Sequence, residues 1–210
     1  MSKIKEISEA IETGKLKLIT DLVNAALDVG LDPLLIMNEG MISAMEAIGE
    51  KFQRSEIFVP EMLIAAKTMK KGLEILKPKL GSAAAASRGL CIIGTVHGDL
   101  HDIGKNLVAL MIESTGFDVI DLGVDVPADT FIGKIKENPG VKLVALSCLL
   151  TTTMPALQKT AEAIKASGLA GFKLIVGGAP VTNEFAERIG ADGYSPDAAS
   201  AADLAKRLTA

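Results

Sequence analysis

The sequence predicts an α/β fold in which an N-terminal four-helix bundle precedes a doubly wound, five-stranded parallel sheet with a Rossmann-like, flavodoxin-like strand order. Residues 1–82 carry only the helical period of apolar side chains, whereas residues 89–210 alternate short β-branched runs with helical segments. These short runs are largely apolar throughout, which is typical of parallel strands covered by helices on both faces of the sheet.

The N-terminal region is expected to form four helices joined by short connections. Their apolar stripes run over Ile4–Ile11, Leu16–Leu27, Met37–Phe52 and Met62–Leu76. The third helix has the clearest start, because the capping residue Asp32 is followed by Pro33 at the first helical position. The methionines of this region are expected in its core, namely Met37, Met41, Met45 and Met62.

A change in composition separates the two regions. Residues 81–88 read Gly-Ser-Ala-Ala-Ala-Ala-Ser-Arg and contain no large apolar side chain, as in an interdomain linker. We therefore expect a helical domain at 1–82, a linker at 83–88 and an α/β domain at 89–210. The linker is a candidate hinge between the two domains.

The second region is predicted to contain five strands, each followed by a helix. The strands are expected at Leu90–Gly94, Asp118–Leu122, Leu143–Ser147, Lys173–Val176 and Asp192–Tyr194. The helices are expected near 103–115, 128–137, 154–167, 182–189 and 198–208. Gly116 and Gly168 are interpreted as helix stops, and Thr153 as the cap before Met154 and Pro155.

Composition narrows the class of protein. With 49% hydrophobic residues, 23% charged residues and a net charge of -4, the chain has no broad basic surface, so nucleic acid is not an expected partner. No apolar run is long enough to cross a membrane, and the N-terminus does not resemble a signal peptide. Cys91 and Cys148 lie in apolar, strand-like runs, so we expect buried free thiols and a cytoplasmic location.

One loop concentrates the residues that could carry chemistry. Residues 94–106 read Gly-Thr-Val-His-Gly-Asp-Leu-His-Asp-Ile-Gly-Lys-Asn, follow the first expected strand and lead into a helix. Both histidines of the chain, His97 and His101, lie here. Ligands bind at the carboxyl ends of strands in doubly wound sheets, so His101 is a candidate metal ligand. His97 and Lys105 are expected to be solvated.

Two further strand ends add polar and glycine residues. The third strand ends in Ser147-Cys-Leu-Leu-Thr-Thr-Thr153, whose hydroxyls can bind a polar group. The fourth ends in Gly177-Gly-Ala-Pro180, where a ligand can approach the backbone closely. The fifth delivers Tyr194 and Ser195.

Competing motifs are mostly absent. The first strand is not followed by the GxGxxG of dinucleotide-binding proteins, and Gly104-Lys105-Asn106 lacks the upstream glycine of a P-loop. Ser147 lacks the GxSxG context of hydrolases. One histidine and two separated cysteines are too few ligands for zinc. A metal held by a single protein ligand must bring its other ligands, which favours a macrocycle.

Three blocks resemble the cobalamin-binding signature of the methionine synthase and corrinoid-protein superfamily. They are Asp99-x-His101-x-x-Gly104, Ser147-x-Leu149 and Gly177-Gly178. The helical region resembles the cap domain of that superfamily in Asn38-Glu-Gly-Met-Ile and Gly49-Glu-Lys-Phe52. The two-domain length and Asp125-Val-Pro127 are most similar to the small corrinoid proteins of methanogen and acetogen methyltransferase systems.

This resemblance implies a cobalamin or related corrinoid bound base-off, with His101 as the lower cobalt ligand. Asp99 would accept the other imidazole N–H, and Thr153 would complete this relay where methionine synthases usually have serine. Ser147 would contact the benzimidazole, and the glycines would make room for the cofactor tail. The complete set of implied cofactor-binding residues is Gly98, Asp99, His101, Asp102, Ile103, Gly104, Ser147, Leu149, Thr151, Thr153, Gly177, Gly178 and Tyr194.

The function implied is that of a methyl carrier, a subunit that is not catalytic alone. Cobalt(I) would accept a methyl group through a substrate-specific methyltransferase, and methyl-cobalt(III) would pass it to a second methyltransferase with a tetrahydrofolate or thiol acceptor. His101 would release cobalt and return in each cycle. A reductive activation protein is a further candidate partner. A cobalamin-dependent sensor and an adenosylcobalamin mutase subunit remain alternatives. The sequence does not name the methyl donor.

Overall fold

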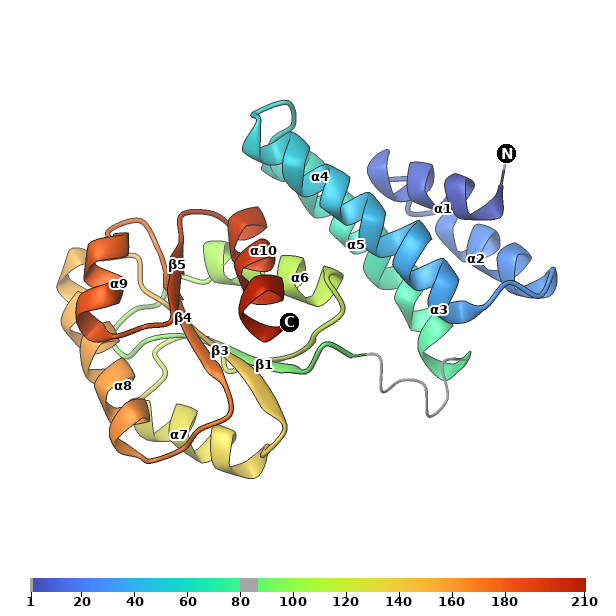
Figure 1. The fold of residues 1–210 in the computed structure, drawn as a ribbon. Helices are drawn as coiled ribbons and strands as arrows, with labels where there is room; N and C mark the ends of the chain where they lie inside the picture. The colour runs from blue at the N-terminus through green and yellow to red at the C-terminus, as the bar shows by residue number, and fades with distance from the viewer. Residues whose placement is uncertain (1, 80–86) are drawn as a thin grey trace. The chain divides into compact units, whose positions relative to one another are not determined.

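The structure is a computed structural model that describes residues 2–79 and 87–210 (Figure 1). The chain separates into two compact units, one formed by residues up to Ser87 together with Ser114–Gly116, and the other by the remaining residues from Arg88. The expected domain boundary at residue 82 and most of the expected linker at 83–88 lie outside the described residues.

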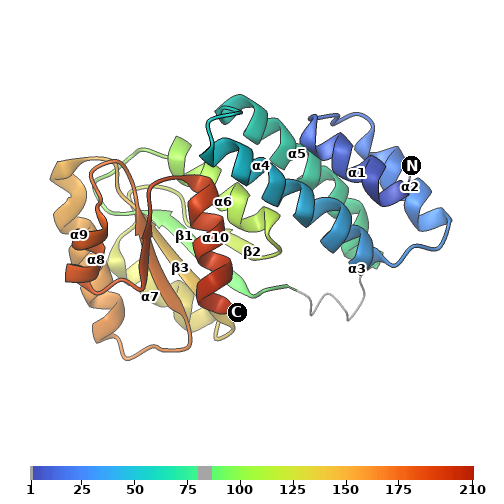
Figure 2. The same cartoon turned by 45° about the horizontal axis from the view of Figure 1, so that its top comes forward.

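The first unit is helical, as predicted. Its elements are α1 (Lys3–Glu12), α2 (Ile19–Asp28), α3 (Pro33–Leu35), the π-helical segment η1 (Ile36–Ile42), α4 (Ser43–Gln53), α5 (Val59–Leu76) and the 3₁₀ turn η2 (Lys77–Lys79). α1 and α5 each pack against both α2 and α4, which gives the four-helix arrangement (Figure 2). The predicted core methionines are buried, namely Met37, Met41, Met45 and Met62.

The third predicted helix departs from a regular α-helix at its centre. Asp32 caps it by accepting the N–H of Leu34 at 3.0 Å, and Pro33 follows as predicted. In η1 the backbone hydrogen bonds span five residues instead of four, so that the N–H of Ser43 donates to the carbonyl of Asn38. Such π-helical segments are rare and have no simple sequence signal, which explains why the helical period alone did not predict one.

The second unit contains the predicted five-stranded parallel sheet, with the strand order β2-β1-β3-β4-β5. Its strands are β1 (Leu90–Thr95), β2 (Asp118–Asp121), β3 (Val141–Ser147), β4 (Lys173–Gly177) and β5 (Gly193–Ser195). All neighbouring strands pair in parallel, and the order is the flavodoxin-like one. The predicted fold class is therefore confirmed, and the strand bounds differ by at most two residues.

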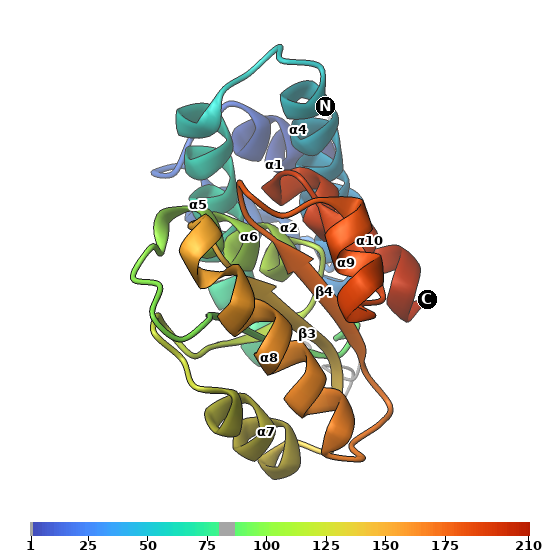
Figure 3. The ribbon, with the colours of Figure 1, turned by 90° about the vertical axis from the view of Figure 1, so that its left-hand side faces the viewer.

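Helices cover both faces of this sheet, as Figure 3 shows. They are α6 (Ile103–Ser114), α7 (Ala128–Glu137), the 3₁₀ turn η4 (Thr151–Thr153), α8 (Met154–Ala166), α9 (Asn183–Ile189) and α10 (Ala198–Thr209). Ile92 and Val144 face one core, to which α7, α8 and α9 contribute. Ile93 and Ala145 face the other core, to which α6 and α10 contribute. Alternate strand residues thus serve opposite faces, which explains the continuous apolar runs.

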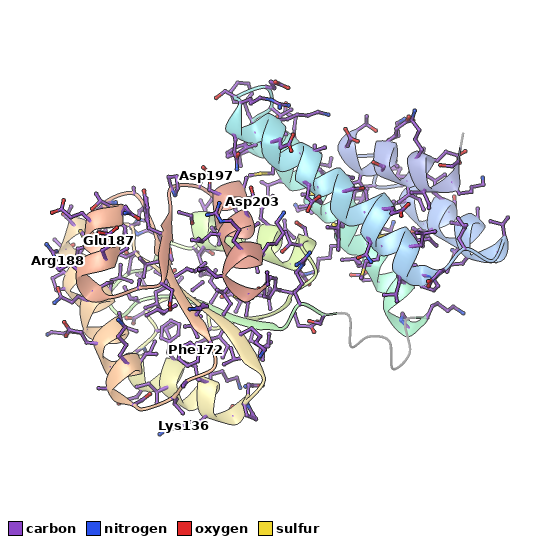
Figure 4. The ribbon with its side chains drawn as sticks, viewed as in Figure 1. Lys136, Phe172, Glu187, Arg188, Asp197 and Asp203 are labelled. Carbon is purple, nitrogen blue, oxygen red and sulfur yellow. The ribbon has the colours of Figure 1, made fainter. Side chains whose placement is uncertain are left out.

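Local capping sets the ends of the last two helices. Asp197 lies directly before α10 (Figure 4). Its Oδ1 accepts the N–H of Ser200 at 2.8 Å. Thr182 caps α9 in the same way, and Gly190 ends that helix with a φ of 68°. Arg188 lies over the ring of Phe185 at 4.9 Å from its centroid.

Within the described residues, no helix has both the length and the apolar character needed to cross a membrane.

The strand order places two loops at the point where ligands bind in this architecture. From β1 the chain runs through α6 on one face to β2, whereas from β3 it runs through α8 on the other face to β4. The loops after β1 and β3 therefore leave neighbouring strand ends in opposite directions, at the carboxyl edge of the sheet where ligands bind in this architecture. These loops contain the residues that the sequence singles out.

Candidate functional site

A buried carboxylate, Asp99, joins the loops that follow β1 and β3. Its side chain is 0% exposed. Oδ1 accepts the backbone N–H of His101 at 3.1 Å, while Oδ2 accepts the N–H of Leu149 at 2.7 Å and the hydroxyl of Thr153 at 2.8 Å. Burial alone would raise the pKa of the Asp99 carboxyl, but these hydrogen bonds outweigh burial and hold that pKa well below its usual range. Asp99 is therefore ionised at neutral pH.

The imidazole of His101 is oriented by this carboxylate. Nδ1 lies 2.8 Å from Asp99 Oδ1. An ionised carboxylate can only accept a hydrogen bond, so the ring proton resides on Nδ1 and Nε2 carries the lone pair that can bind a metal. The hydroxyl of Thr95, at the end of β1, donates to the carbonyl of His101 at 2.9 Å. The side chain of His101 is 49% exposed, so its ring is open to a ligand.

The buried hydroxyl of Thr153 extends this relay into the protein. It lies in η4, directly before α8, where it also approaches the carbonyl of Leu150 at 3.0 Å. The Sγ atom of Cys148 lies 3.2 Å from Thr153 Oγ1. Burial raises the pKa of the Cys148 thiol, which therefore stays protonated and can donate to Thr153. The structure thus brings together the predicted residues Asp99, His101 and Thr153, and it adds Cys148.

Several large apolar side chains near His101 in the sequence, and in the loop after β3, are exposed to solvent. Leu100 is 72% exposed and Ile103 is 82% exposed, on the two sides of His101 along the chain. In the loop after β3, the two residues that follow Cys148, Leu149 and Leu150, are each about two-fifths exposed. Large apolar side chains normally avoid water, so a concentration of them at one strand edge suggests a surface that an apolar ligand covers.

The predicted glycines differ in what surrounds them. A Cβ at Gly104 would meet no protein atom within 4 Å, so the protein itself does not require glycine there. Gly98 has a φ of 82°, which explains glycine there by backbone conformation. At Gly177 a Cβ would lie 3.2 Å from the carbonyl oxygen of Ser195. At Gly178 it would lie only 1.7 Å from the carbonyl oxygen of Cys148, so the fold itself requires glycine there.

The remaining predicted residues occupy different positions along the sheet edge. Ser147 ends β3 in register with Gly177 of β4. Asp102 precedes α6, and Thr151 is exposed in η4. The structure does not bring Tyr194 to His101, because it lies on β5, three strand spacings or about 14 Å from β1. Its ring packs partly buried against the core beneath α7, α8 and α9.

Comparison with known proteins identifies the family. Residues 89–203, more than half of the chain, match the family described as "B12 binding domain". The chain belongs to the B12-binding family of corrinoid proteins. Residues 3–77 match a second model that is also described as a B12 binding domain. Both units of this B12-binding protein therefore have counterparts in the family, as the sequence resemblance predicts.

Several relatives match this chain over most of their own length. It is 41% identical to the trimethylamine corrinoid protein of Methanosarcina barkeri, over 93% of this chain and 91% of that protein. A cobalamin-binding protein from Desulfitobacterium hafniense has a similar crystal structure, with a TM-score of 0.81, 31% identity and coverage of 98% of both chains. A chain of the methanol:cobalamin methyltransferase complex MtaBC from Methanosarcina barkeri gives a TM-score of 0.87 and 27% identity, over 99% of this chain and 79% of that one.

The burial of Lys105 differs from the expectation based on the sequence. This lysine was expected to be a solvated helix charge, but its side chain is only 2% exposed. Its ammonium pairs with the carboxylate of Asp121 at the end of β2 and donates to Oδ1 of Asn106 at 2.6 Å. The sequence pattern of α6 could not show this burial, because the partner carboxylate lies on another element. Asp121 also accepts the N–H of Gly123 at 2.8 Å.

Substitutions of Asp121 and of Lys105 should lower the free energy of unfolding by different amounts. Asp121→Asn leaves a buried ammonium without its charge partner, so we expect the free energy of unfolding to fall by about 3 kcal/mol. Lys105→Met removes the buried charge, and Asp121, which is 37% exposed, can then be hydrated, so a loss of about 1 kcal/mol is expected. Urea unfolding curves of both variants measure the difference.

The control for this prediction is the exposed ion pair of Lys134 and Glu137, 2.8 Å apart on α7. Glu137→Gln should change the stability by less than about 0.5 kcal/mol, because exposed pairs contribute little. Equal losses for Asp121→Asn and Lys105→Met would show that the ammonium of Lys105 reaches water, contrary to the burial described above.

Proposed function

We propose that this protein is a corrinoid methyl carrier in which Nε2 of His101 is the lower axial ligand of a base-off corrinoid. The observation that carries this proposal is the pairing of His101 with Asp99. A buried, ionised carboxylate holds the proton on Nδ1, while the ring itself is 49% exposed. This arrangement fixes the orientation of the ring and leaves Nε2 available to bind a metal, as carboxylate partners do for ligating histidines.

The residues around His101 fit such a group. A single imidazole supplies one ligand, so a metal bound there must carry the rest, as the cobalt of a corrin ring does. The exposed apolar side chains of Leu100, Ile103 and Leu149 suit the largely apolar face of that ring. Gly104 leaves free space on the first turn of α6, where a side chain would meet no protein atom within 4 Å. Ser147, Gly177 and Gly178 are proposed to contact the cofactor tail.

When bound, the corrinoid would supply a cobalt centre that takes up and releases a methyl group. The protein would bind and orient it and control one proton. With His101 as a ligand, Asp99 stabilises the neutral ring with its proton on Nδ1. The backbone N–H groups of Leu149 and His101, and then the hydroxyl of Thr153 at 2.8 Å from Oδ2, keep Asp99 ionised by donating to it.

The proposed partners are methyltransferases. The names of the relatives support this proposal, since they are trimethylamine and dimethylamine corrinoid proteins, and a structural neighbour belongs to a methanol:cobalamin methyltransferase complex. We propose a substrate-specific methyltransferase, an acceptor methyltransferase and a reductive activation protein.

His101→Ala is expected to retain some corrinoid but to change its absorbance and electron paramagnetic resonance spectra. The measurement uses ¹⁵N-labelled protein reconstituted with unlabelled cobalamin and reduced to the cobalt(II) form. A protein imidazole as axial ligand splits each cobalt line into a doublet, because the coupled nucleus is ¹⁵N. The cofactor's own benzimidazole would give a triplet from ¹⁴N. We expect the doublet in the unmodified sequence and its loss in His101→Ala.

His97→Ala is the matched control, since His97 is the second imidazole of the same loop and pairs with Asp125 at 2.7 Å. It should keep the doublet. A triplet in the unmodified protein would refute histidine ligation but leave corrinoid binding intact. Reconstituted protein that stays colourless and free of cobalt would refute the methyl-carrier proposal altogether.

A further inference from the structure

A backbone conformation that few residues adopt occurs beside the His101 loop. Asp125, in the loop between β2 and α7, has a φ of 54°. Within residues 2–79 and 87–210, Ser55 is the only other non-glycine residue with a positive φ. Residues with a large Cβ substituent avoid this region, and Asp and Asn tolerate it better than most. Asp125 therefore holds a conformation that needs compensating contacts.

Those contacts all go to the loop that carries His101. The backbone N–H of Asp125 donates to the carbonyl of Asp99 at 2.9 Å. The Oδ1 atom of Asp125 accepts the backbone N–H of Gly98 at 2.7 Å and lies 2.7 Å from Nδ1 of His97. The hydrogen bond from Gly98 lowers the pKa of the Asp125 carboxyl, so this group is an ionised carboxylate at neutral pH.

The segment around Asp125 is anchored to the end of β1. The N–H of Thr95 donates to the carbonyl of Gly123 at 3.0 Å, and the N–H of Val126 donates to the carbonyl of Thr95 at 2.9 Å. Val96 and Val126 form a parallel bridge. The left-handed turn at Asp125 lies between these anchors, and it aims both its N–H and its carboxylate at the loop that begins at His97.

We propose that Asp125 is a positioning residue, which fixes the backbone at Gly98 and Asp99 so that the carboxylate of Asp99 stays paired with His101. The proposal rests on the function proposed above, because its purpose is to orient the His101 ring. The side chain must be short, tolerate a positive φ and accept a hydrogen bond, and Asp and Asn meet these needs better than most residues. His97 is exposed and shares the same oxygen, so its contact is secondary to that of Gly98.

The test compares Asp125→Gly with Asp125→Asn in the protein without corrinoid. Glycine adopts the positive φ freely, so Asp125→Gly removes the side-chain acceptor without strain. We expect the amide protons of Gly98 and His101 to exchange with solvent about tenfold faster. The ¹⁵N shifts of the His101 ring should move towards a mixture of tautomers. Asn keeps an acceptor oxygen for Gly98, so Asp125→Asn should restore both signals to nearly those of the unmodified protein.

A second measurement follows cobalamin binding by absorbance. Asp125→Gly is expected to raise the Kd for cobalamin about tenfold, and Asp129→Asn, an exposed carboxylate on the first turn of α7, should leave it unchanged. Unchanged amide exchange and ring shifts in Asp125→Gly would overturn the positioning role, as would a failure of Asn to restore them. If the unmodified protein binds no cobalamin, the proposed function fails, but exchange in the corrinoid-free protein still decides the role of Asp125.

Discussion

Gly178→Ala is expected to unfold much of the α/β unit or to leave it severely destabilised, with a loss of about 4 kcal/mol. The alanine Cβ would lie 1.7 Å from the carbonyl oxygen of Cys148, a distance that no side chain can tolerate. The φ of 127° at Gly178 is also unfavourable for any L residue. Relief requires β3 and β4 to separate at their ends, which breaks the hydrogen bond from Cys148 N to Gly177 O at 3.1 Å.

Hydrogen exchange of the β3 and β4 amides measures this loss directly, since the two units of the chain can unfold separately. Gly133→Ala is the matched control. Gly133 lies inside α7, where a Cβ would meet nothing within 4 Å, so the substitution should stabilise the protein by up to about 1 kcal/mol. If Gly178→Ala were as stable as Gly133→Ala, the close approach of Gly178 to Cys148 would be disproved.

Asp99→Asn is expected to lower the free energy of unfolding at neutral pH by about 3 kcal/mol, despite its nearly identical shape. Both oxygens of Asp99 accept donors, from His101 on one side and from Leu149 and Thr153 on the other. An amide has only one acceptor oxygen, so its NH₂ group must face donors on one side. At least two donors then lose the acceptor that Asp99 supplied, whichever way the amide is turned.

The effect of Asp99→Asn should depend on pH with a defined sign. Because the pKa of Asp99 lies below the unfolded value of about 3.9, its contribution is fully present above that value and is lost as the pH falls through the lower folded pKa. The gap between the two proteins should therefore narrow as the pH falls below about 4. Asp129→Asn, with an exposed carboxylate, should show a gap near zero throughout. A gap that is unchanged at pH 3 would contradict this account.

The elements of the α/β unit could be predicted closely because their signals are local. The helix at 128–137 was predicted with its observed bounds, and the five apolar runs became the five strands. The positions of Asp99, His101 and Thr153 were also predictable, since loops after parallel strands meet at one edge of a sheet. The family resemblance predicted that Asp99 contacts the ring of His101 and that Thr153 completes this relay. The structure shows both contacts.

Other features depend on partners far away in the sequence. The burial of Lys105 depends on Asp121 and therefore on the pairing of β1 with β2. Thr95 is a polar residue at the end of an apolar strand, which is typical of a side chain with a specific partner. The sequence could not show that this partner is the backbone carbonyl of His101. The contacts of Asp125 with Gly98 likewise arise only when the loop after β2 lies beside the loop after β1.

By itself, the sequence determined the fold class, the family and the loop that carries the imidazole, because apolar periodicity, turn residues and motif spacing are properties of consecutive residues. Only the tertiary structure decided which glycines the fold requires, which lysine is buried and which carboxylate fixes the loop of His101. Those properties follow from contacts between segments that meet only after folding, and the distances between atoms on separate strands are not encoded in any local pattern.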